Sequence, residues 1–300
     1  MSSPVSRRDR LAINPLSFLL EGSGLDLSPE RLHASFTDIA RAGYTAVHAD
    51  VPPHLTPREY GALLASYGLR PAPGYFGGFF DQPDARNDTV EGARRHAAAT
   101  AELGVDTMFI AQHMCEVRRA HPAIGLEPSA ERVTIMADGL ELAAQAARAE
   151  GVTAALHPHV GSWIEVEAEV RGVLDRTRGG ALMFGPDTGH LAFAGMDPAG
   201  LVADYRDRVA AIHLKDLDTA AAARVLAEGT SYFDATRADR IWAEPGSGAL
   251  DLTAVLDALP PDFDGWYVVE VDLPKHGTPF DSAVLSRENL LCLPYFAKDA

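Results

Sequence analysis

The chain has 300 residues, of which 47% are hydrophobic, and 42 acidic side chains face 26 lysines and arginines, giving a formal net charge of −16. A chain of this length can bury one large core, and a single α/β barrel commonly needs about 250 residues. The acidic balance argues against a nucleic-acid partner, because phosphate binding requires a basic face.

The sequence also bears on the compartment. No run approaches the ~20 apolar residues of a membrane span, so we expect no membrane association. Cys115 and Cys292 are far apart and form no metal-type spacing, which favours a reducing cytoplasm. Residues 1–10 are polar and arginine-bearing, and we expect them to form a flexible tail before the domain 11–300.

From residue 11 onward, segments typical of strands alternate with segments typical of helices. Apolar runs that end at polar or turn residues predict strands at 11–14, 45–50, 69–75, 105–111, 152–157, 181–184, 209–214 and 266–271. Helical spacing predicts helices at 28–43, 56–68, 89–103, 129–150, 166–177, 198–205, 252–259 and 282–291. Ser28-Pro29 and Thr56-Pro57 are typical helix starts, an N-cap followed by proline.

Eight repeats of strand then helix imply parallel strands with right-handed crossovers. In one chain of this length they favour a single (β/α)8 TIM barrel over an open doubly wound sheet. Residues 216–241 interrupt the alternation, and we interpret them as a βα-loop insertion over the mouth of the barrel, a candidate lid. A surface excursion that packs only its own aromatic side chains is the alternative.

Acids and histidines recur where the expected strands end. The pairs are His48/Asp50, His157/His159, Asp187/His190, His213/Lys215 and Glu270/Asp272. Functional groups of such barrels sit at the carboxyl ends of the strands, so these side chains are expected to converge on one site.

A divalent metal ion suits this set. Asp187, His213 and Glu270 are the best candidate ligands, because carboxylates suit hard ions and imidazole shifts the preference toward Mn²⁺, Co²⁺ or Zn²⁺. A fourth ligand is expected from the fifth strand or its loop, where His157, His159 and Glu165 compete. We expect one divalent ion, Mn²⁺ before Co²⁺, Mg²⁺ or Zn²⁺.

The remaining polar side chains are candidates for catalysis and substrate binding. His159, His190 and Lys215 are the catalytic candidates, since a histidine or a lysine near a metal can transfer a proton or polarise a carbonyl group. His48, His157 and Asp216 are the candidate substrate-binding residues. An ion pair between Lys215 and Asp216 is an equally weighted alternative for that lysine.

Several motifs in this order carry a family resemblance. They are His157-Pro-His159-Val-Gly161-Ser162, Asp187-Thr-Gly-His190-Leu, Ala194-Gly195-Met-Asp197-Pro198, His213-Leu-Lys-Asp216, Pro245-Gly-Ser-Gly248 and Gly265-Trp266-Tyr-Val-Val-Glu270. With them, residues 11–295 resemble the xylose-isomerase-like barrel superfamily of sugar isomerases, epimerases and lyases, and within it the inosose dehydratases.

The resemblance places Asp187, His213 and Glu270 on the family's metal-binding positions. It also implies a glutamate ending strand five, where this chain has His157-Pro-His159, and we favour Glu165 as the residue that reaches in. A second departure is His48, at a position where the dehydratases imply a glutamate.

The resemblance implies a metal-dependent lyase that dehydrates a keto-cyclitol or keto-sugar through an enolate. A ketose epimerase or aldose–ketose isomerase is the first alternative, since the same site can reprotonate the enolate. A barrel subunit of a lyase that cleaves 3-keto-C-glycosides, working with a partner chain, and a non-catalytic barrel are further alternatives. The expected partner is a small keto-sugar or cyclitol, with a homo-oligomer or partner subunit also weighed.

Overall fold

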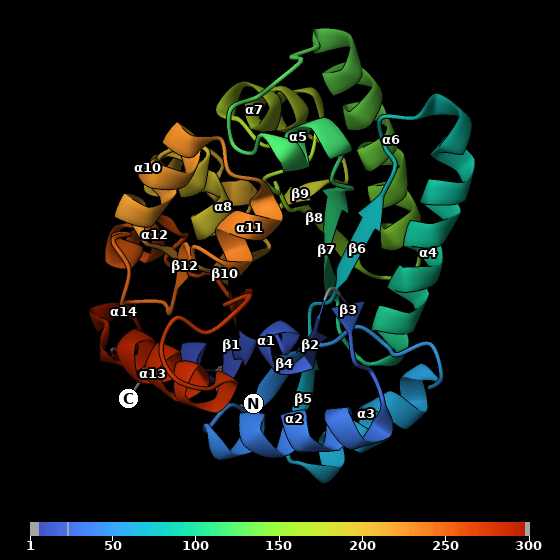
Figure 1. Ribbon diagram of the computed structural model, residues 1–300. Helices are drawn as coiled ribbons and strands as arrows, with labels where there is room; N and C mark the ends of the chain where they lie inside the picture. The colour runs from blue at the N-terminus through green and yellow to red at the C-terminus, as the bar shows by residue number, and fades with distance from the viewer. Residues whose placement is uncertain (1–5, 23, 298–300) are drawn as a thin grey trace.

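The computed structural model describes residues 6–22 and 24–297, and its strands form a ring surrounded by helices (Figure 1). A five-stranded sheet has the order β10 (Ala211–Leu214), β13 (Trp266–Val269), β1 (Leu11–Ile13), β4 (Ala46–His48), β5 (Arg70–Ala72). A four-stranded sheet has the order β6 (Tyr75–Gly78), β7 (Thr107–Gln112), β8 (Thr153–Leu156), β9 (Met183–Phe184). All of these strand pairs are parallel, which confirms the α/β TIM barrel.

The ring is joined differently on its two sides. Parallel bridges Phe184↔Val209 and Asp187↔His213 connect β9 to β10. On the other side the strand expected at 69–75 is divided into β5 and β6. The division falls at Gly74, where a Cβ atom would lie 2.5 Å from the carbonyl oxygen of Ala49, so the close approach of two backbones requires glycine.

Eight helices follow the expected order around the strands. They are α2 (Pro29–Arg41), α3 (Pro57–Ser66), α4 (Arg86–Glu102), α6 (Ala130–Ala149), α7 (Glu167–Arg176), α9 (Pro198–Asp204), α12 (Leu252–Ala258) and α13 (Pro279–Cys292). Ser28 and Thr56 accept a backbone hydrogen bond as N-caps, with proline at the first helical turn. The cap-and-proline prediction is therefore confirmed at both helices.

Small side chains occupy much of the barrel interior. Ala12, Ala46, Ala72 and Ala211 form one buried cluster with Phe109, Trp266 and Val268. The larger core lies between the strands and the surrounding helices, where leucine is the commonest residue. Because the interior alanines take little room, the ring of Phe109 extends up to the polar side chains at the strand ends.

Further elements lie on the mouth side of the barrel. After β1 come α1 (Leu16–Leu19) and a hairpin of β2 (Leu20–Glu21) and β3 (Gly24–Leu25). Later additions on this side are α5 (Glu116–Ala120) and α8 (Thr188–Phe193), whereas α14 (Pro294–Ala297) contacts the residues that precede β1. The segment expected to be an insertion contains α10 (Thr219–Glu228) and α11 (Tyr232–Arg237), framed by the antiparallel pair β11 (Asp216–Leu217) and β12 (Trp242–Ala243).

The expected tail is described only from residue 6. Arg7–Arg10 form a 3-10 helix, in which Arg8 Nε donates to the Phe296 carbonyl oxygen at 3.0 Å and Arg10 lies over the Trp266 ring. Within the described residues, no helix has both the length and the apolar character needed to cross a bilayer.

Candidate functional site

The strand-end side chains meet at a cavity of about 400 Å³. His48, His157, His159, His213 and Glu270 line this cavity. Among the described residues, Asp187, His190 and Lys215 are buried next to the lining residues rather than part of it. The structure therefore brings the expected strand-end side chains together, although Asp187, His190 and Lys215 do not line the cavity wall.

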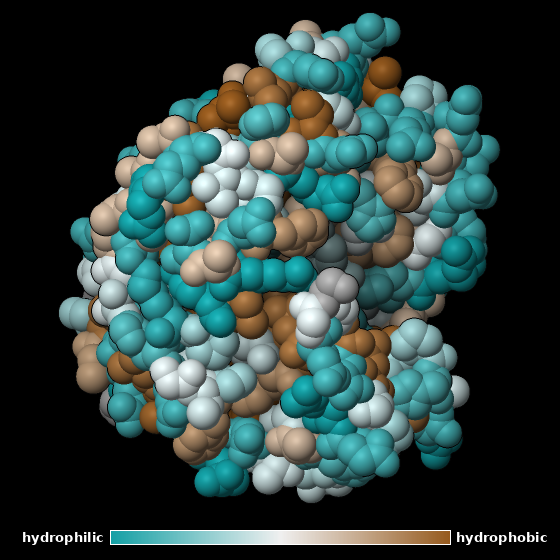
Figure 2. Space-filling view, viewed as in Figure 1, coloured by the Kyte–Doolittle hydropathy of each residue, from teal (hydrophilic) through white to brown (hydrophobic). Residues whose placement is uncertain are grey.

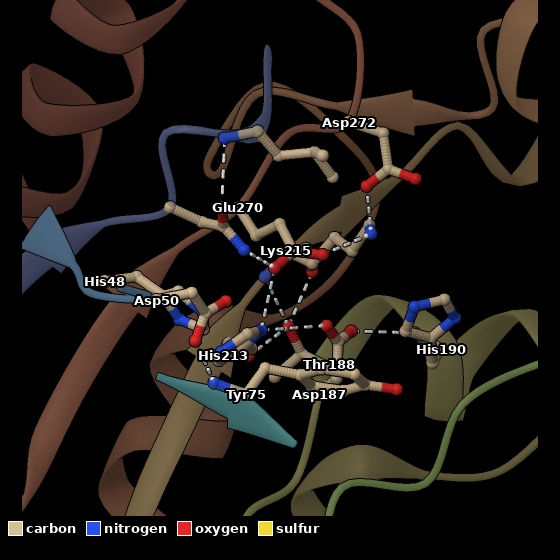
Figure 3. Close-up of polar contacts among 12 residues, drawn as sticks. His48, Asp50, Tyr75, Asp187, Thr188, His190, His213, Lys215, Glu270 and Asp272 are labelled. Atoms are coloured by element: carbon tan, nitrogen blue, oxygen red, sulfur yellow. Dashed lines mark hydrogen bonds and ion pairs between the residues drawn. The ribbon is translucent and has the colours of Figure 1, made fainter. Parts of the chain in front are cut away.

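Asp187 holds the centre of the site. The chain turns after β9 and starts α8 directly, and the Oδ1 atom of Asp187 accepts the His190 backbone N–H at 2.9 Å as its N-cap. The Oδ2 atom is buried and has no hydrogen-bond partner in the described chain. It lies 3.6 Å from Nδ1 of His213, so the free oxygen of this cap faces the other candidate ligands (Figure 3).

His213 and Glu270 come from the neighbouring strands β10 and β13. The Nδ1 atom of His213 lies 3.0 Å from the Oε2 atom of Glu270, without the orientation of a hydrogen bond. Burial alone would lower the pKa of His213, but Glu270 and Asp187 more than offset it and raise that pKa to about 9. Asn14, at the end of β1, donates to the same Oε2 atom at 2.6 Å and fixes the carboxylate.

Lys215 is an interior cation. Its Nζ atom donates to Glu270 Oε1 at 2.9 Å and to a carboxylate oxygen of Asp272 (Figure 3). The same atom lies 4.4 Å from the centre of the Trp242 ring. Burial opposes its charge, yet Asp272 and Glu270 hold the pKa of Lys215 well above its ordinary value. The pKa of Glu270 is held well below its ordinary value in spite of burial, by Lys215 and His213. Lys215 therefore stays protonated and orients Glu270.

The imidazoles of His157, His159 and His190 lie next to the charged group of His213, Lys215 and Glu270. The ring centroids of His159 and His190 lie 3.9 Å apart, and those of His157 and His213 lie 4.7 Å apart. Burial lowers the pKa of His159 to about 4 and lowers the pKa values of His157 and His190 well below the ordinary value. These three rings are neutral at physiological pH, so each offers a nitrogen lone pair.

The donor atoms fit a divalent cation. Ligand atoms of His157, Asp187 and His213 lie within 4.8 Å of one another, and so do those of Asp187, His190 and Glu270. Buried atoms without a hydrogen-bond partner in the described chain include Asp187 Oδ2 and both ring nitrogens of His213 and of His190. Buried polar atoms normally have partners, so this set of unpaired carboxylate and imidazole atoms is typical of a metal site, where His213 would bind after losing a proton.

Glu165 lies outside this group. Its carboxylate accepts backbone N–H groups of Ala123, Gly125 and Gly161 at 2.8–3.1 Å, and Arg118 lies 3.4 Å away. The structure thus gives Glu165 a full set of partners in the loop after β8, and His157 takes the place next to Asp187 and His213 that we expected for Glu165.

The side chain of Asp216 also binds backbone N–H groups outside the cavity. Its Oδ2 atom accepts the N–H groups of Gly246 and Gly248, and its Oδ1 atom accepts that of Leu250 at 3.0 Å. The side chain anchors the turn after β12 instead of facing the cavity, which contradicts the substrate-binding interpretation. The alternative ion pair with Lys215 is wrong as well, because Lys215 pairs with Glu270 and Asp272.

His48 and the insertion complete the wall. His48 Nε2 lies 3.2 Å from Asp50 Oδ2, and its Nδ1 atom is buried without a partner in the described chain. From α11, Tyr232 donates to Asp272 at 3.4 Å and its ring lies 5.5 Å from that of His159. The insertion therefore packs onto the site and not only onto its own aromatic side chains.

One residue of the site was missed, and another was named without a role. Asn14 follows the apolar run of β1 and was not a candidate, whereas Asp272 was expected at the site with Glu270 but was given no specific role. Neither carries a distinctive motif, and only the contacts with Glu270 and Lys215 reveal their place.

Comparisons with known proteins identify the family of the chain. Residues 36–293 match the family described as xylose isomerase-like TIM barrel. An inosose dehydratase of Geobacillus thermodenitrificans is 26% identical over 231 residues, covering 75% of this chain and 77% of that protein. The rhizopine catabolism protein MocC of Rhizobium meliloti is 29% identical over 293 residues, covering 94% of this chain and 87% of that protein.

Solved structures show the same fold at lower identity. The IOLI protein with a bound zinc atom has a TM-score of 0.69 at 15% identity, covering 97% of this chain and 99% of that one. The 3-keto-D-glucoside 4-epimerase YcjR of E. coli has a TM-score of 0.67 at 18% identity, covering 95% and 98%. With a family match that spans most of its length and a barrel that carries the site at the strand ends, this chain belongs to the xylose isomerase-like TIM barrel family.

Proposed function

We propose that the chain is a divalent-metal-dependent lyase that removes water from a keto-cyclitol or keto-sugar, as an inosose dehydratase does. The observation that carries this proposal is the group of unpaired buried donor atoms beside the cavity, on Asp187, His213 and His157. The relatives named inosose dehydratase and the fold shared with a sugar epimerase support an enzyme that acts on sugars.

Asp187, His213, Glu270 and His157 would hold the metal. Two carboxylates and two imidazoles favour Mn²⁺, Co²⁺ or Zn²⁺ over Mg²⁺, and Mn²⁺ remains our first choice. When bound, the cation supplies electrostatic stabilisation of negative charge that develops on a substrate carbonyl oxygen.

His159 is the proposed base. Its Nδ1 atom lies 2.7 Å from the Val160 carbonyl oxygen, which can only accept, so the proton sits on Nδ1 and the lone pair on Nε2. With its pKa lowered to about 4, the imidazole is neutral and ready to take the proton next to the substrate carbonyl. His190 lies behind His159 and supports that ring, and we no longer assign it a direct contact with substrate.

His48 is the proposed group that protonates the leaving hydroxyl. It lines the cavity, and its Nε2 atom lies 3.2 Å from Asp50 Oδ2, which fixes the orientation of the ring. Lys215 holds a proton throughout and keeps Glu270 in place. If no hydroxyl leaves, reprotonation of the enolate gives an epimerase, the activity named for YcjR, whose fold this chain shares.

The test combines metal content with proton exchange. The purified chain is incubated in D₂O with 2-keto-myo-inositol and a panel of ketoses, and exchange next to the carbonyl is followed by NMR. A dehydrated product supports the lyase, and a product of inverted configuration supports the epimerase. A chain that takes up no divalent ion and catalyses no exchange contradicts both.

The variant Asp187→Asn distinguishes a loss of metal binding from a loss of folding. Asparagine is an equally good N-cap, so α8 is retained while the free carboxylate oxygen is lost. Asp197→Asn is the matched control, since Asp197 caps α9 in the same way at an exposed position. We expect Asp187→Asn to lose metal and exchange, His159→Asn to keep metal and lose exchange, and Asp197→Asn to keep both.

A further inference from the structure

The cavity of the candidate site has two chemically different halves. Beside the imidazoles and Glu270, its wall continues into apolar side chains, which we call the leucine arm and define as Leu16, Leu19, Leu25, Leu27, Leu32 and Val51. Figure 2 shows hydrophobic residues around the hollow at the centre of this face.

Part of the leucine arm is left uncovered by the protein itself. Leu19 and Leu32 are buried and also belong to the core, so packing alone explains them. Leu16 and Leu27 are only half-buried, and Leu25, at the end of β3, is 50% exposed. These three side chains keep apolar surface open to the cavity, where a bound molecule would cover it.

A fully hydroxylated ring does not match this half of the cavity. Leucine and valine side chains offer no donor or acceptor, so each hydroxyl placed there would lose its hydrogen bonds to water without replacement. The reacting ring therefore belongs at the polar half, beside His159, His48 and the proposed metal ligands. Only a substituent on that ring can reach the leucine arm.

A neighbouring cavity extends the site toward the insertion. A second cavity of about 270 Å³ shares Leu16, Leu25 and His159 with the first, but it continues to Tyr232, Thr236 and Arg237. Both cavities carry apolar side chains, and the second adds polar groups of the insertion that the six side chains of the leucine arm lack.

We propose that the substrate is a keto-sugar or keto-cyclitol bearing an apolar aryl or alkyl substituent, and that this substituent binds in the leucine arm. The inference rests on the proposed function for the identity of the ring, and it adds the class of its substituent. An apolar substituent gains about fourfold in affinity for each methylene group that it buries, while the ring keeps its polar contacts.

The experiment compares 2-keto-myo-inositol with its O-benzyl ether on the metal-loaded chain. Calorimetry gives the two dissociation constants, and proton exchange in D₂O gives the two rates independently. We expect the ether to bind at least about tenfold more tightly, in line with several buried carbon atoms. Equal or weaker binding of the ether overturns the inference.

Substitutions in the leucine arm test whether it causes the tighter binding of the ether. Leu25→Ser changes an exposed side chain and is expected to leave the fold intact, and Leu27→Ser tests the next position along the same wall. Each is expected to reduce the preference for the ether to about threefold or less, with the affinity for the parent ketone as internal reference. Leu142→Ser is the control, because Leu142 is 43% exposed on α6 and away from both cavities.

The outcomes also separate this inference from the proposed function. Tighter binding of the ether without proton exchange in either compound supports the leucine arm and contradicts the enolate chemistry. Exchange in both compounds without a preference for the ether supports the chemistry and overturns the leucine arm. An unchanged preference in both leucine variants overturns it too.

Discussion

Replacing Lys215 by methionine tests the charge balance of the site. Lys215 is fully buried and its Nζ atom pairs with Glu270 and Asp272. Methionine keeps the length of the side chain but leaves two buried carboxylates without their cation. Removing one partner of a buried ion pair typically costs about 3–5 kcal/mol, so a loss of roughly 4 kcal/mol is expected in the metal-free chain. For 300 residues this lowers the melting temperature by about 6 °C.

The assay is urea unfolding at pH 8 in the presence of a chelator. Lys275→Met is the matched control, because Lys275 pairs with Asp218 at 2.5 Å with a quarter of its side chain exposed, and such pairs contribute about 1 kcal/mol or less. A loss below about 1 kcal/mol in Lys215→Met would refute the reasoning. So would equal losses in the two variants.

The difference between wild type and Lys215→Met should depend on pH. In the wild type the pKa of Glu270 is depressed, so its contribution to stability is present above the ordinary carboxyl range and is lost as the pH falls. In the variant, Asp272 loses its cation and Glu270 keeps only His213 and Asn14, so burial raises the pKa values of both carboxyls and their protonation relieves the loss as the pH falls. The difference in unfolding free energy should therefore be largest near pH 8 and shrink toward pH 5.

Three further outcomes are expected. Glu165→Gln puts an amide group against backbone N–H donors and should cost about 1–3 kcal/mol of unfolding free energy, with metal affinity measured by calorimetry unchanged; loss of metal by a folded variant would restore Glu165 as a ligand. Asp216→Asn should cost a similar amount, about 1–3 kcal/mol, again without loss of metal, and a variant as stable as wild type would contradict the anchoring role. Mn²⁺ at about 100 times its dissociation constant should add about 2.7 kcal/mol, or about 4 °C in melting temperature, and Asp187→Asn should abolish this shift; an equal shift in the variant would exclude Asp187 as a ligand.

Local signals made the barrel predictable. Each expected strand is an apolar run followed by a polar residue or a turn, and helices such as α2 and α3 begin with a cap and proline. These signals act within a few residues, so sequence reasoning can use them. The same rule located Asp187, His213 and Glu270, because parallel strands bring their carboxyl ends together.

The roles of individual side chains were harder to predict, because they depend on partners far away in the sequence. Glu165 and His157 both follow the same region of the fifth strand, and only the distant N–H groups of Ala123 and Gly125 decide that the glutamate is structural. Asp216 likewise depends on a turn 30 residues later in the chain. The site itself was predictable from strand ends, whereas these assignments required contacts that no local pattern encodes.

The leucine arm also has a consequence for how this protein can diversify. Five of its six residues come from one continuous stretch, 16–32, which holds α1, the hairpin and the first turn of α2. The proposed metal ligands come from other parts of the chain, at the ends of β8, β9, β10 and β13. Substitutions in residues 16–32 can therefore change which ring substituent the protein binds. The proposed metal ligands need not change with them.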